Sequence, residues 1–558
     1  MSRKTVPLLL LLLAAALPLG VWAKGKAEKD NGAAEKPIEV SYMIRIKSGE
    51  DTTWFLQEVE KATGVRIKPN GIDANDREKV ATMLATGDLP DVVVQQDNYQ
   101  LYKDGLTRAI SRAAIEKNMP GLTGRLNRDY PSGWLTFRIQ GKQDEYVAVT
   151  GISESSFANL WYVELRQDWA EKVGLGVPNF DAKKVPMDRW GRAYYVEENM
   201  SLEWFEKLLF AFRDKDPDGN GKNDTIPLGA NKLFAHSWTT LLGAFGVGQG
   251  YNLMENGKLT EWNVSNGYKE FLKLVQRWYK AGLVDREFAN LDVTPAWQKI
   301  EKHIVGAFAG VNVDYADTEA TKSRPPNSFL NDEDVKAGAK AVVIPPLVGP
   351  GGKQGGPIYS TLPIGVYGWA VSKKVDDAKL ARILSMIDWM RAGSNETWVS
   401  SLYGQENVHF KWQGEAWKSA ALPVDQKDIP AGNTKIGDFG SVYPVYRTQD
   451  RFQFIYPEWN NRFKDYILHG NGRKYEIVPY RLDLMNETKL TDVRKKYGAT
   501  MDTIRDEFMF KAMTGALDID KEWDGYVAEW LKNGGQESLN ESAKAPLYDE
   551  LRKGIVKY

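Results

Sequence analysis

The nine residues 216–224 (DPDGNGKND) could bind a metal ion. Oxygen-bearing side chains stand at the first, third, fifth and ninth positions of this loop: Asp216, Asp218, Asn220 and Asp224. Gly221 holds the sixth position, and the backbone carbonyl of Lys222 would supply a ligand at the seventh. This alternation lets a turning backbone aim several hard oxygen ligands at one Ca²⁺ ion, as in an EF-hand.

Two features limit the comparison with an EF-hand. The twelfth position, which carries a bidentate Glu in an EF-hand, is Pro227 in this chain. Asp, Asn, Gly and Pro are also the residues of which solvated turns are made, so an ordinary turn is the alternative. A bound Ca²⁺ would be structural and would fix the loop after the preceding helix.

Most residue patterns that support catalysis are missing from the chain. It has no cysteine, which excludes disulfides, thiolate metal sites and cysteine nucleophiles. Its four histidines do not form an H-E-x-x-H zinc motif, and neither G-x-S-x-G nor a P-loop occurs. The 19 Trp, 25 Tyr and 20 Phe instead supply aromatic surface, and the net charge of −1 argues against a nucleic-acid partner. The composition therefore favours binding over catalysis.

The first 23 residues follow the order of a secretory signal peptide. Arg3 and Lys4 precede an apolar run over residues 6–17, and a small-residue cleavage site ends at Ala23. The run is short for a membrane-spanning helix, which leaves an uncleaved anchor as the alternative. No cysteine follows it for lipid attachment. We expect a soluble periplasmic protein, cleaved after Ala23, with the polar residues 24–37 as a flexible leader.

Strand-like and helical segments alternate along the chain, which predicts an α/β fold with largely parallel sheets. Apolar and β-branched runs predict strands at residues 38–46, 65–68, 91–95, 161–165, 304–313 and 365–372. Apolar residues at helical spacing predict helices at residues 53–63, 76–85, 168–173, 202–213, 267–281 and 376–391. The last hundred residues are expected to be mostly helical, most strongly at 490–508 and 519–533.

Several segments resemble the family 1 extracellular solute-binding proteins that serve ABC importers. Residues 160–169 read LWYVELRQDW, and residues 216–228 read DPDGNGKNDTIPL. GDLPD at 87–91, GWAVS at 368–372 and YGQENVHF at 403–410 agree as well, in the family's order. The sub-group most similar to this chain contains the longer oligosaccharide binders, including the calcium-containing alginate-oligosaccharide-binding proteins.

The resemblance implies a two-lobed periplasmic-binding-protein fold, with crossing hinge segments and a ligand held between the lobes. We expect lobe 1 to comprise residues 38–160 and 366–445, and lobe 2 to comprise residues 161–365 and 446–558. A carbohydrate ligand, an ABC permease with its ATPase, and a monomeric state are also implied. The chain lacks the lipidated cysteine of many relatives, and Thr225 stands where the alginate-type loop commonly has a carboxylate.

Candidate ligand-binding residues follow from the chemistry of sugars, whose C–H faces pack on aromatic rings and whose hydroxyls hydrogen-bond to polar side chains. The aromatic candidates near the expected crossings and in lobe 2 are Trp161, Tyr162, Trp238, Trp297, Tyr315, Tyr359, Tyr367 and Trp369. The resemblance to alginate binders adds Tyr456, Glu458 and Trp459. Polar candidates near strand ends that open onto a cleft are Arg45, Asp97 and Asn98. The alternative for each aromatic residue is core packing, and for each polar residue simple solvation.

The main functional hypothesis is an exported, non-enzymatic protein that delivers an oligosaccharide to an ABC importer. A secreted polysaccharide hydrolase or lyase is the first alternative, because 74 acidic residues allow many pairs of catalytic carboxyl groups. A periplasmic sensor protein without a transport role is the second. A peptide or another polar solute as the ligand also stays open.

Overall fold

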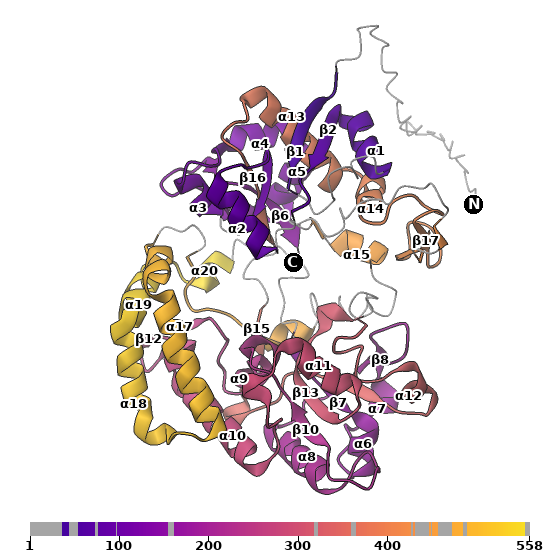
Figure 1. Ribbon diagram of the computed structural model, residues 1–558, viewed down its shortest axis with the longest axis vertical. Coiled ribbons are helices and arrows are strands. Elements are labelled where there is room, and N and C mark those ends of the chain that lie inside the picture. The colour runs from indigo at the N-terminus through magenta and orange to yellow at the C-terminus, as the bar shows by residue number, and fades with distance from the viewer. Residues whose placement is uncertain are drawn as a thin grey trace, which may run out of the picture.

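The computed structural model describes residues 36–43, 54–72, 76–95, 98–153, 161–316, 322–358, 364–425, 428–429, 446–447, 449–455, 471–483 and 488–552. Its strands form two separate six-stranded sheets, one in each of two lobes (Figure 1). Helices pack on both faces of each sheet. The predicted two-lobed α/β fold is confirmed.

The sheet of the first lobe contains six strands in the order β19-β6-β16-β3-β1-β2. Their bounds are β1 (Ile38–Tyr42), β2 (Val65–Pro69), β3 (Val92–Gln95), β6 (Val149–Ser153), β16 (Ile364–Val371) and β19 (Tyr446–Arg447). β16 is antiparallel to both of its neighbours, while the other strands share one direction. The helices of this lobe are α1 (Trp54–Thr63), α2 (Arg77–Thr86), α3 (Asn98–Lys103), α4 (Arg112–Asn118), α5 (Pro120–Arg128), α13 (Asp377–Arg391), α14 (Asn395–Tyr403) and α15 (Gln449–Ile455).

The second sheet has the order β10-β13-β7-β14-β9-β8. Its strands are β7 (Trp161–Arg166), β8 (Val185–Pro186), β9 (Tyr194–Tyr195), β10 (Ile226–Gly229), β13 (Val305–Asn312) and β14 (Ala341–Ile344). β7 runs against β13 and β14, which both end beside its first residues. The helices around this sheet are α6 (Gln167–Lys172), α7 (Phe180–Lys183), α8 (Leu202–Asp214), α9 (Thr239–Gly243), α10 (Asn266–Ala281), α11 (Val293–Glu301) and α12 (Asp332–Lys336).

Local capping explains why the predicted helices begin and end where they do. α10 starts after Ser265, whose hydroxyl accepts a hydrogen bond from the backbone N–H of Tyr268, and it ends at Gly282 with φ at 77°. α2 is capped in the same way by Asp76 and Gly87. Because both signals are local, the sequence predicts these helices closely.

The chain stays in the first lobe further than the expected boundary at residue 446. β19 pairs with β6 of the first sheet, and α15 follows it. Arg451 is buried and donates hydrogen bonds to the backbone carbonyls of Arg391 and Gly393, each at 2.8 Å. Ile455 packs against the cores of both lobes. The return to the second lobe therefore follows Ile455.

The C-terminal region packs on the second lobe through α17 (Leu490–Thr514), α18 (Ile519–Trp530), α19 (Gln536–Ser542) and α20 (Tyr548–Arg552), as Figure 1 shows. Gln276 of α10 donates hydrogen bonds to the carbonyls of Ala512 and Leu517 at 2.8 and 3.1 Å. The first turns of α17 also meet α3 of the first lobe, where Lys103 Nζ lies 3.8 Å from Asp492 Oδ1. The prediction of a mostly helical tail is confirmed.

The expected export signal and leader at residues 1–35 lie outside the described residues. Among the helices that the structure describes, none has the length and apolar character needed to cross a membrane.

One carboxyl group is buried in the second sheet without a hydrogen bond. Glu164 of β7 is fully buried, and neither of its carboxyl oxygens accepts a hydrogen bond from a described residue. Burial raises the pKa of Glu164 well above its ordinary value, and the nearby carboxylate of Asp188 adds to the rise. The folded protein therefore holds this carboxyl group in its protonated form more strongly than the unfolded chain does.

We expect Glu164→Gln to stabilise the protein increasingly as the pH rises. Below the ordinary carboxyl pKa of about 4.3 both states of the wild type are protonated, so the two proteins should melt alike. Between that value and the raised pKa only the unfolded wild type releases the proton, which lowers its stability, whereas Gln does not titrate. Thermal melts from about pH 4 to pH 8 measure the difference.

The matched control is Glu301→Gln, which changes an exposed side chain of α11 in the same lobe. A gap between Glu164→Gln and wild type that stays constant with pH would contradict the assignment. A wild type that is more stable than Glu164→Gln at pH 8 would also contradict the assignment.

Candidate functional site

Aromatic side chains gather at one edge of the second sheet. Trp161 is the first residue of β7, and Tyr315 ends the short helix η6 (Val313–Tyr315) directly after β13. His236 ends η3 (Phe234–His236), which follows β10. Because β10 and β13 are parallel, their carboxyl ends meet at this edge, and such edges are where ligands bind in α/β sheets.

The rings form a continuous row of edge-to-face contacts. The ring centroids of Trp161 and His236 lie 5.5 Å apart, and those of His236 and Trp297 lie 5.9 Å apart. Trp297, from α11, lies 6.3 Å from Tyr315. The guanidinium carbon of Arg324 lies 5.4 Å from the ring centre of Trp297 and 5.2 Å from that of Tyr315. We call these five residues the aromatic shelf.

The shelf remains partly open to solvent. Trp161 is mostly buried, whereas His236, Trp297, Tyr315 and Arg324 are half-buried. α11, which carries Trp297, lies on the side of the second lobe that faces the first lobe (Figure 1). The half-buried rings can therefore meet a ligand held between the lobes.

Gly310 of β13 allows η3 to approach the sheet at this edge. A Cβ atom at this position would lie 2.2 Å from the carbonyl oxygen of His236, so no larger residue fits without a shift of the backbone. The close approach places His236 between the two tryptophans of the shelf.

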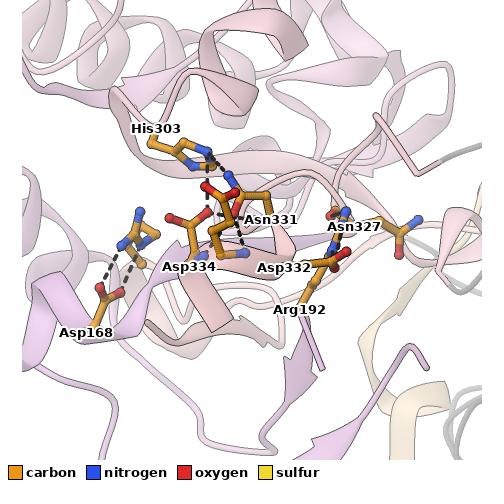
Figure 2. Close-up of polar contacts among 9 residues, drawn as sticks. Asp168, Arg192, His303, Asn327, Asn331, Asp332 and Asp334 are labelled. Atoms are coloured by element: carbon orange, nitrogen blue, oxygen red, sulfur yellow. Dashed lines mark hydrogen bonds and ion pairs between the residues drawn. The ribbon is translucent and has the colours of Figure 1, made fainter. Parts of the chain in front are cut away.

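A hydrogen-bond network fixes the segment that carries Arg324 (Figure 2). Asn327 is buried and donates a hydrogen bond to the carbonyl of Tyr315 at 2.7 Å, and its own carbonyl accepts one from Arg192 at 3.5 Å. Arg192 Nη2 also donates to Asp332 at 2.7 Å, and this hydrogen bond lowers the pKa of the Asp332 carboxyl. The described part of the segment before α12 is thus tied to Tyr315 and to Arg192.

A second group of contacts holds the start of α12 (Figure 2). The amide oxygen of Asn331 accepts hydrogen bonds from the backbone N–H groups of Glu333 and Asp334, which caps the helix. His303 Nε2 lies 3.1 Å from Asn331 Nδ2 and 3.3 Å from Asp334 Oδ2. These contacts anchor the loop to the segment that precedes β13.

The electrostatics of the shelf come from Arg324. Burial lowers the pKa of His236, and the positive charge of Arg324 lowers it further. His236 is therefore neutral at neutral pH. Among the residues that the structure describes, no carboxylate forms an ion pair with Arg324. Sequence reasoning missed both residues, because no local motif marks either of them.

Three of the predicted aromatic residues lie in the cores. Trp238 is fully buried in the second lobe, with its ring centroid 5.2 Å from that of Phe288. Trp369 is buried at the centre of the first sheet. Tyr162, also fully buried, packs edge-to-face on Tyr195. A ring with no exposed face cannot stack on a sugar, so we assign these three residues to packing.

Asn98 begins α3, directly after β3 in the first lobe. It is fully buried, and its side chain packs against Gly368 of β16, where an added Cβ would lie 2.8 Å from Asn98 Nδ2. Its place at the carboxyl end of β3 is the one expected from the sequence, but its side chain is not open to solvent. The candidates Arg45, Asp97, Tyr359, Tyr456, Glu458 and Trp459, and the side chain of Tyr367, lie outside the described residues.

The candidate metal loop lies at the opposite edge of the second sheet. It precedes β10, whose carboxyl end points toward the shelf. Asn220 Nδ2 donates hydrogen bonds to Asp218 Oδ2 at 2.8 Å and to Asp224 Oδ1 at 2.9 Å. The carboxylate of Asp216 accepts hydrogen bonds from the backbone N–H groups of Gly219, Asn220 and Gly221. This loop is remote from the shelf, so a metal there would have a structural role.

The donors in the loop match calcium in chemistry, since they are carboxylate, amide and carbonyl oxygens. A hydrogen bond with Asp218 lowers the pKa of Asp216, while burial and that same hydrogen bond raise the pKa of Asp218. In the described part of the chain, no three Asp, Glu or His side chains converge as a metal-binding group. The loop as described is a hydrogen-bonded turn built from residues of the type that calcium prefers.

Comparisons with known sequences agree with the fold. No protein-family model matches the chain. The chain is 24% identical over 549 residues to lipoprotein LipO of Bacillus subtilis, which covers 95% of this chain and 97% of LipO. It is 21% identical over 552 residues to the polygalacturonan/rhamnogalacturonan-binding protein YtcQ of the same species, covering 96% of this chain and 98% of YtcQ.

Solved structures extend the comparison. FusA, an ABC-transporter substrate-binding protein of Streptococcus pneumoniae solved with kestose, matches with a TM-score of 0.66 and 18% identity, over 92% of this chain and 100% of FusA. An EF-hand mutant of FusA matches with a TM-score of 0.65 and 20% identity, over the same shares. The alginate-binding protein AlgQ2, solved without calcium ion, matches with a TM-score of 0.60 and 18% identity, over 92% of this chain and 98% of AlgQ2.

These likenesses define the class of fold, which is that of the two-lobed ABC-transporter substrate-binding proteins. The family resemblance predicted from the sequence is confirmed. Full-length matches to LipO and YtcQ show that the similarity spans both lobes and the helical C-terminal region.

We expect Arg324→Gln to raise the pKa of His236. The substitution removes the nearby positive charge that disfavours the protonated imidazole, while the burial of the ring remains. The pKa of His236 should therefore rise toward, but not reach, the ordinary value of about 6.5. An NMR titration of the His236 ring protons measures it.

Arg286→Gln is the control, because Arg286 stacks on Tyr279 at 5.0 Å outside the shelf. It should leave the titration of His236 unchanged. An unchanged pKa of His236 in Arg324→Gln would show that the two groups are not neighbours in solution.

Proposed function

We propose that this protein is the substrate-binding component of an ABC importer and captures an oligosaccharide between its two lobes. The observation that carries the proposal is the aromatic shelf, a row of rings at the carboxyl ends of β10 and β13 in which those of His236, Trp297 and Tyr315 are half-buried. Aromatic faces pack on the C–H faces of sugar rings, and a row of them suits a chain of several sugars.

The relatives support a carbohydrate ligand. YtcQ is named for binding polygalacturonan and rhamnogalacturonan, FusA was solved with kestose, and AlgQ2 is named for binding alginate. These ligands differ in charge and linkage, but all of them are oligomeric or polymeric sugars. An oligosaccharide is therefore the ligand class that we propose for this chain.

Binding without catalysis is the role that best suits the shelf. Its described members supply rings, an imidazole and a guanidinium, which are groups for packing and hydrogen bonding. A glycoside hydrolase places two carboxyl groups across the scissile bond. The buried carboxyl groups of Glu164 and Asp188 lie in the core of the sheet rather than on the shelf. We therefore propose that the protein is not an enzyme.

The proposed mechanism is closure of the two lobes around the ligand. A sugar that contacts both lobes binds the closed form more tightly than the open form and so shifts the population toward closure. The permease in the inner membrane would recognise the closed form and accept the sugar from it. The export signal expected at residues 1–23 fits a monomeric periplasmic protein with this role.

Calorimetric titration with a panel of oligosaccharides tests the proposal. Heat that saturates with no product formed supports a binder, and steady turnover of the sugar would instead identify an enzyme. Acidic and neutral oligosaccharides belong in the panel, together with short peptides as the alternative ligand class.

Trp297→Ala should weaken oligosaccharide binding by more than about tenfold, since the ring is a central member of the shelf. Trp204→Ala is the matched control, because Trp204 is a half-buried helical tryptophan of the same lobe that lies in α8, outside the shelf. Calorimetric affinities and thermal melts should be measured for both. Equal affinities of Trp297→Ala and wild type, with a folded variant, would remove Trp297 from the site.

We also propose that the loop at residues 216–224 holds a structural Ca²⁺ ion. The carboxylates of Asp216, Asp218 and Asp224, the side-chain oxygen of Asn220 and the carbonyl of Lys222 would hold it. When bound, the ion would neutralise neighbouring carboxylates and stiffen the turn between α8 and β10. The EF-hand of FusA and the calcium ion named for AlgQ2 support the proposal.

Removal of calcium by a chelator should lower the melting temperature. At a calcium concentration about 100-fold above the dissociation constant, the ion would contribute about 2.7 kcal/mol to the free energy of unfolding. Asp218→Asn with Asp224→Asn should abolish the response to chelator. Identical melts of the wild type with and without chelator would refute a bound calcium ion.

A further inference from the structure

Arg324 differs from Arg166 and Arg192, two buried arginines of the same lobe. Arg166 pairs with Asp168 at 2.6 Å, and Arg192 pairs with Asp332 at 2.7 Å. Arg324 instead lies over the rings of Trp297 and Tyr315 and has no carboxylate partner among the described residues. Partly buried charges in proteins are normally paired with an opposite charge. The guanidinium of Arg324 can therefore pair with an anionic group that does not belong to the described chain.

The geometry leaves the donor groups of Arg324 available. A guanidinium that stacks on aromatic rings is covered on its face, while its N–H groups point outward in its own plane. The hydrogen bond from Asn327 to the carbonyl of Tyr315 joins the backbone next to Arg324 to the shelf. Because the segment is fixed before a ligand arrives, little side-chain entropy is lost when Arg324 binds one.

We infer that Arg324 pairs with a carboxylate of the bound sugar, so that the oligosaccharide taken by this protein is acidic and contains uronic acid residues. The inference deepens the proposed function and rests on it. A carboxylate accepts two parallel hydrogen bonds from the planar guanidinium and neutralises its charge. A sugar hydroxyl cannot accept this parallel pair of hydrogen bonds and carries no negative charge to neutralise the guanidinium. The half-buried rings of Trp297 and Tyr315 would pack on the sugar rings that carry the acid groups.

The described acidic residue of the hydrogen-bond network, Asp332, does not compete with a ligand for Arg324. Its carboxylate already accepts a hydrogen bond from Arg192 Nη2 at 2.7 Å.

The test compares each acidic oligosaccharide with its own methyl ester, which keeps the rings, linkages and length and removes only the charge. Suitable pairs are the tetramers of galacturonic, mannuronic and glucuronic acid and their fully methylated esters, titrated by calorimetry into the intact protein. At least one acid should bind the wild type ten or more times more tightly than its ester, as a charge-assisted hydrogen bond requires.

Arg324→Gln should lower the affinity for that acid by about 10- to 100-fold and change the affinity for the ester by less than about threefold. Arg324→Lys should retain part of the preference, because it keeps the charge and loses the planar pair of donors. Arg286→Gln, which alters an arginine stacked on Tyr279 outside the shelf, should bind like the wild type.

The outcomes separate this inference from the proposed function. Equal affinities for acid and ester, or an equal loss of both in Arg324→Gln, would overturn the inference and leave oligosaccharide binding intact. Binding of kestose or another neutral oligosaccharide in place of every acid would do the same. If none of the acidic or neutral sugars binds, the proposed function itself fails.

Discussion

The direction of β7 is the constraint on which the functional part of this molecule depends. The chain enters the second lobe through β7, which runs against both β13 and β14 in the middle of the sheet. The first residue of β7 must therefore lie where its neighbours end, at the edge nearest the crossing from β6. Trp161 occupies that position, and the residues that follow β10 and β13 join it there. β16 of the first lobe has the same central antiparallel placement after the second crossing.

The shelf also depends on polar anchors beneath it. Asn327, Arg192 and Asp332 hold the loop that carries Arg324, and Gly310 lets η3 approach the sheet. The candidate calcium loop is at the other end of β10. The proposed ligand-binding site and the proposed calcium site therefore lie at opposite edges of one sheet.

The sequence predicts those parts of the fold whose causes are local. Ser265 and Gly282 mark the ends of α10 by capping, and the apolar run of β13 marks a buried strand. The lobe to which α15 belongs was not predictable, because it depends on hydrogen bonds from Arg451 to residues of the α13 region.

The site was predictable only in part, for the same reason. Trp161 could be named because it is an aromatic residue near an expected crossing. Trp297 and Tyr315 could be named as aromatic residues of the second lobe that are able to stack on a sugar. Trp297 is half-buried whereas Trp238 is fully buried, and nothing in the local sequence of either residue predicts this difference. Arg324 and His236 reach the shelf through contacts between segments far apart in the chain, which no spacing rule detects.

Hydrogen–deuterium exchange with and without a bound oligosaccharide tests most directly where the ligand lies. Exchange should slow on binding in the segments that carry the shelf, at residues 234–237, 293–301, 313–316 and 322–327. Exchange in the loop at residues 216–224, which lies at the opposite edge of the same sheet, should not change. Protection confined to other surfaces, with the shelf segments unaffected, would contradict the central claim that the shelf is the sugar-binding site.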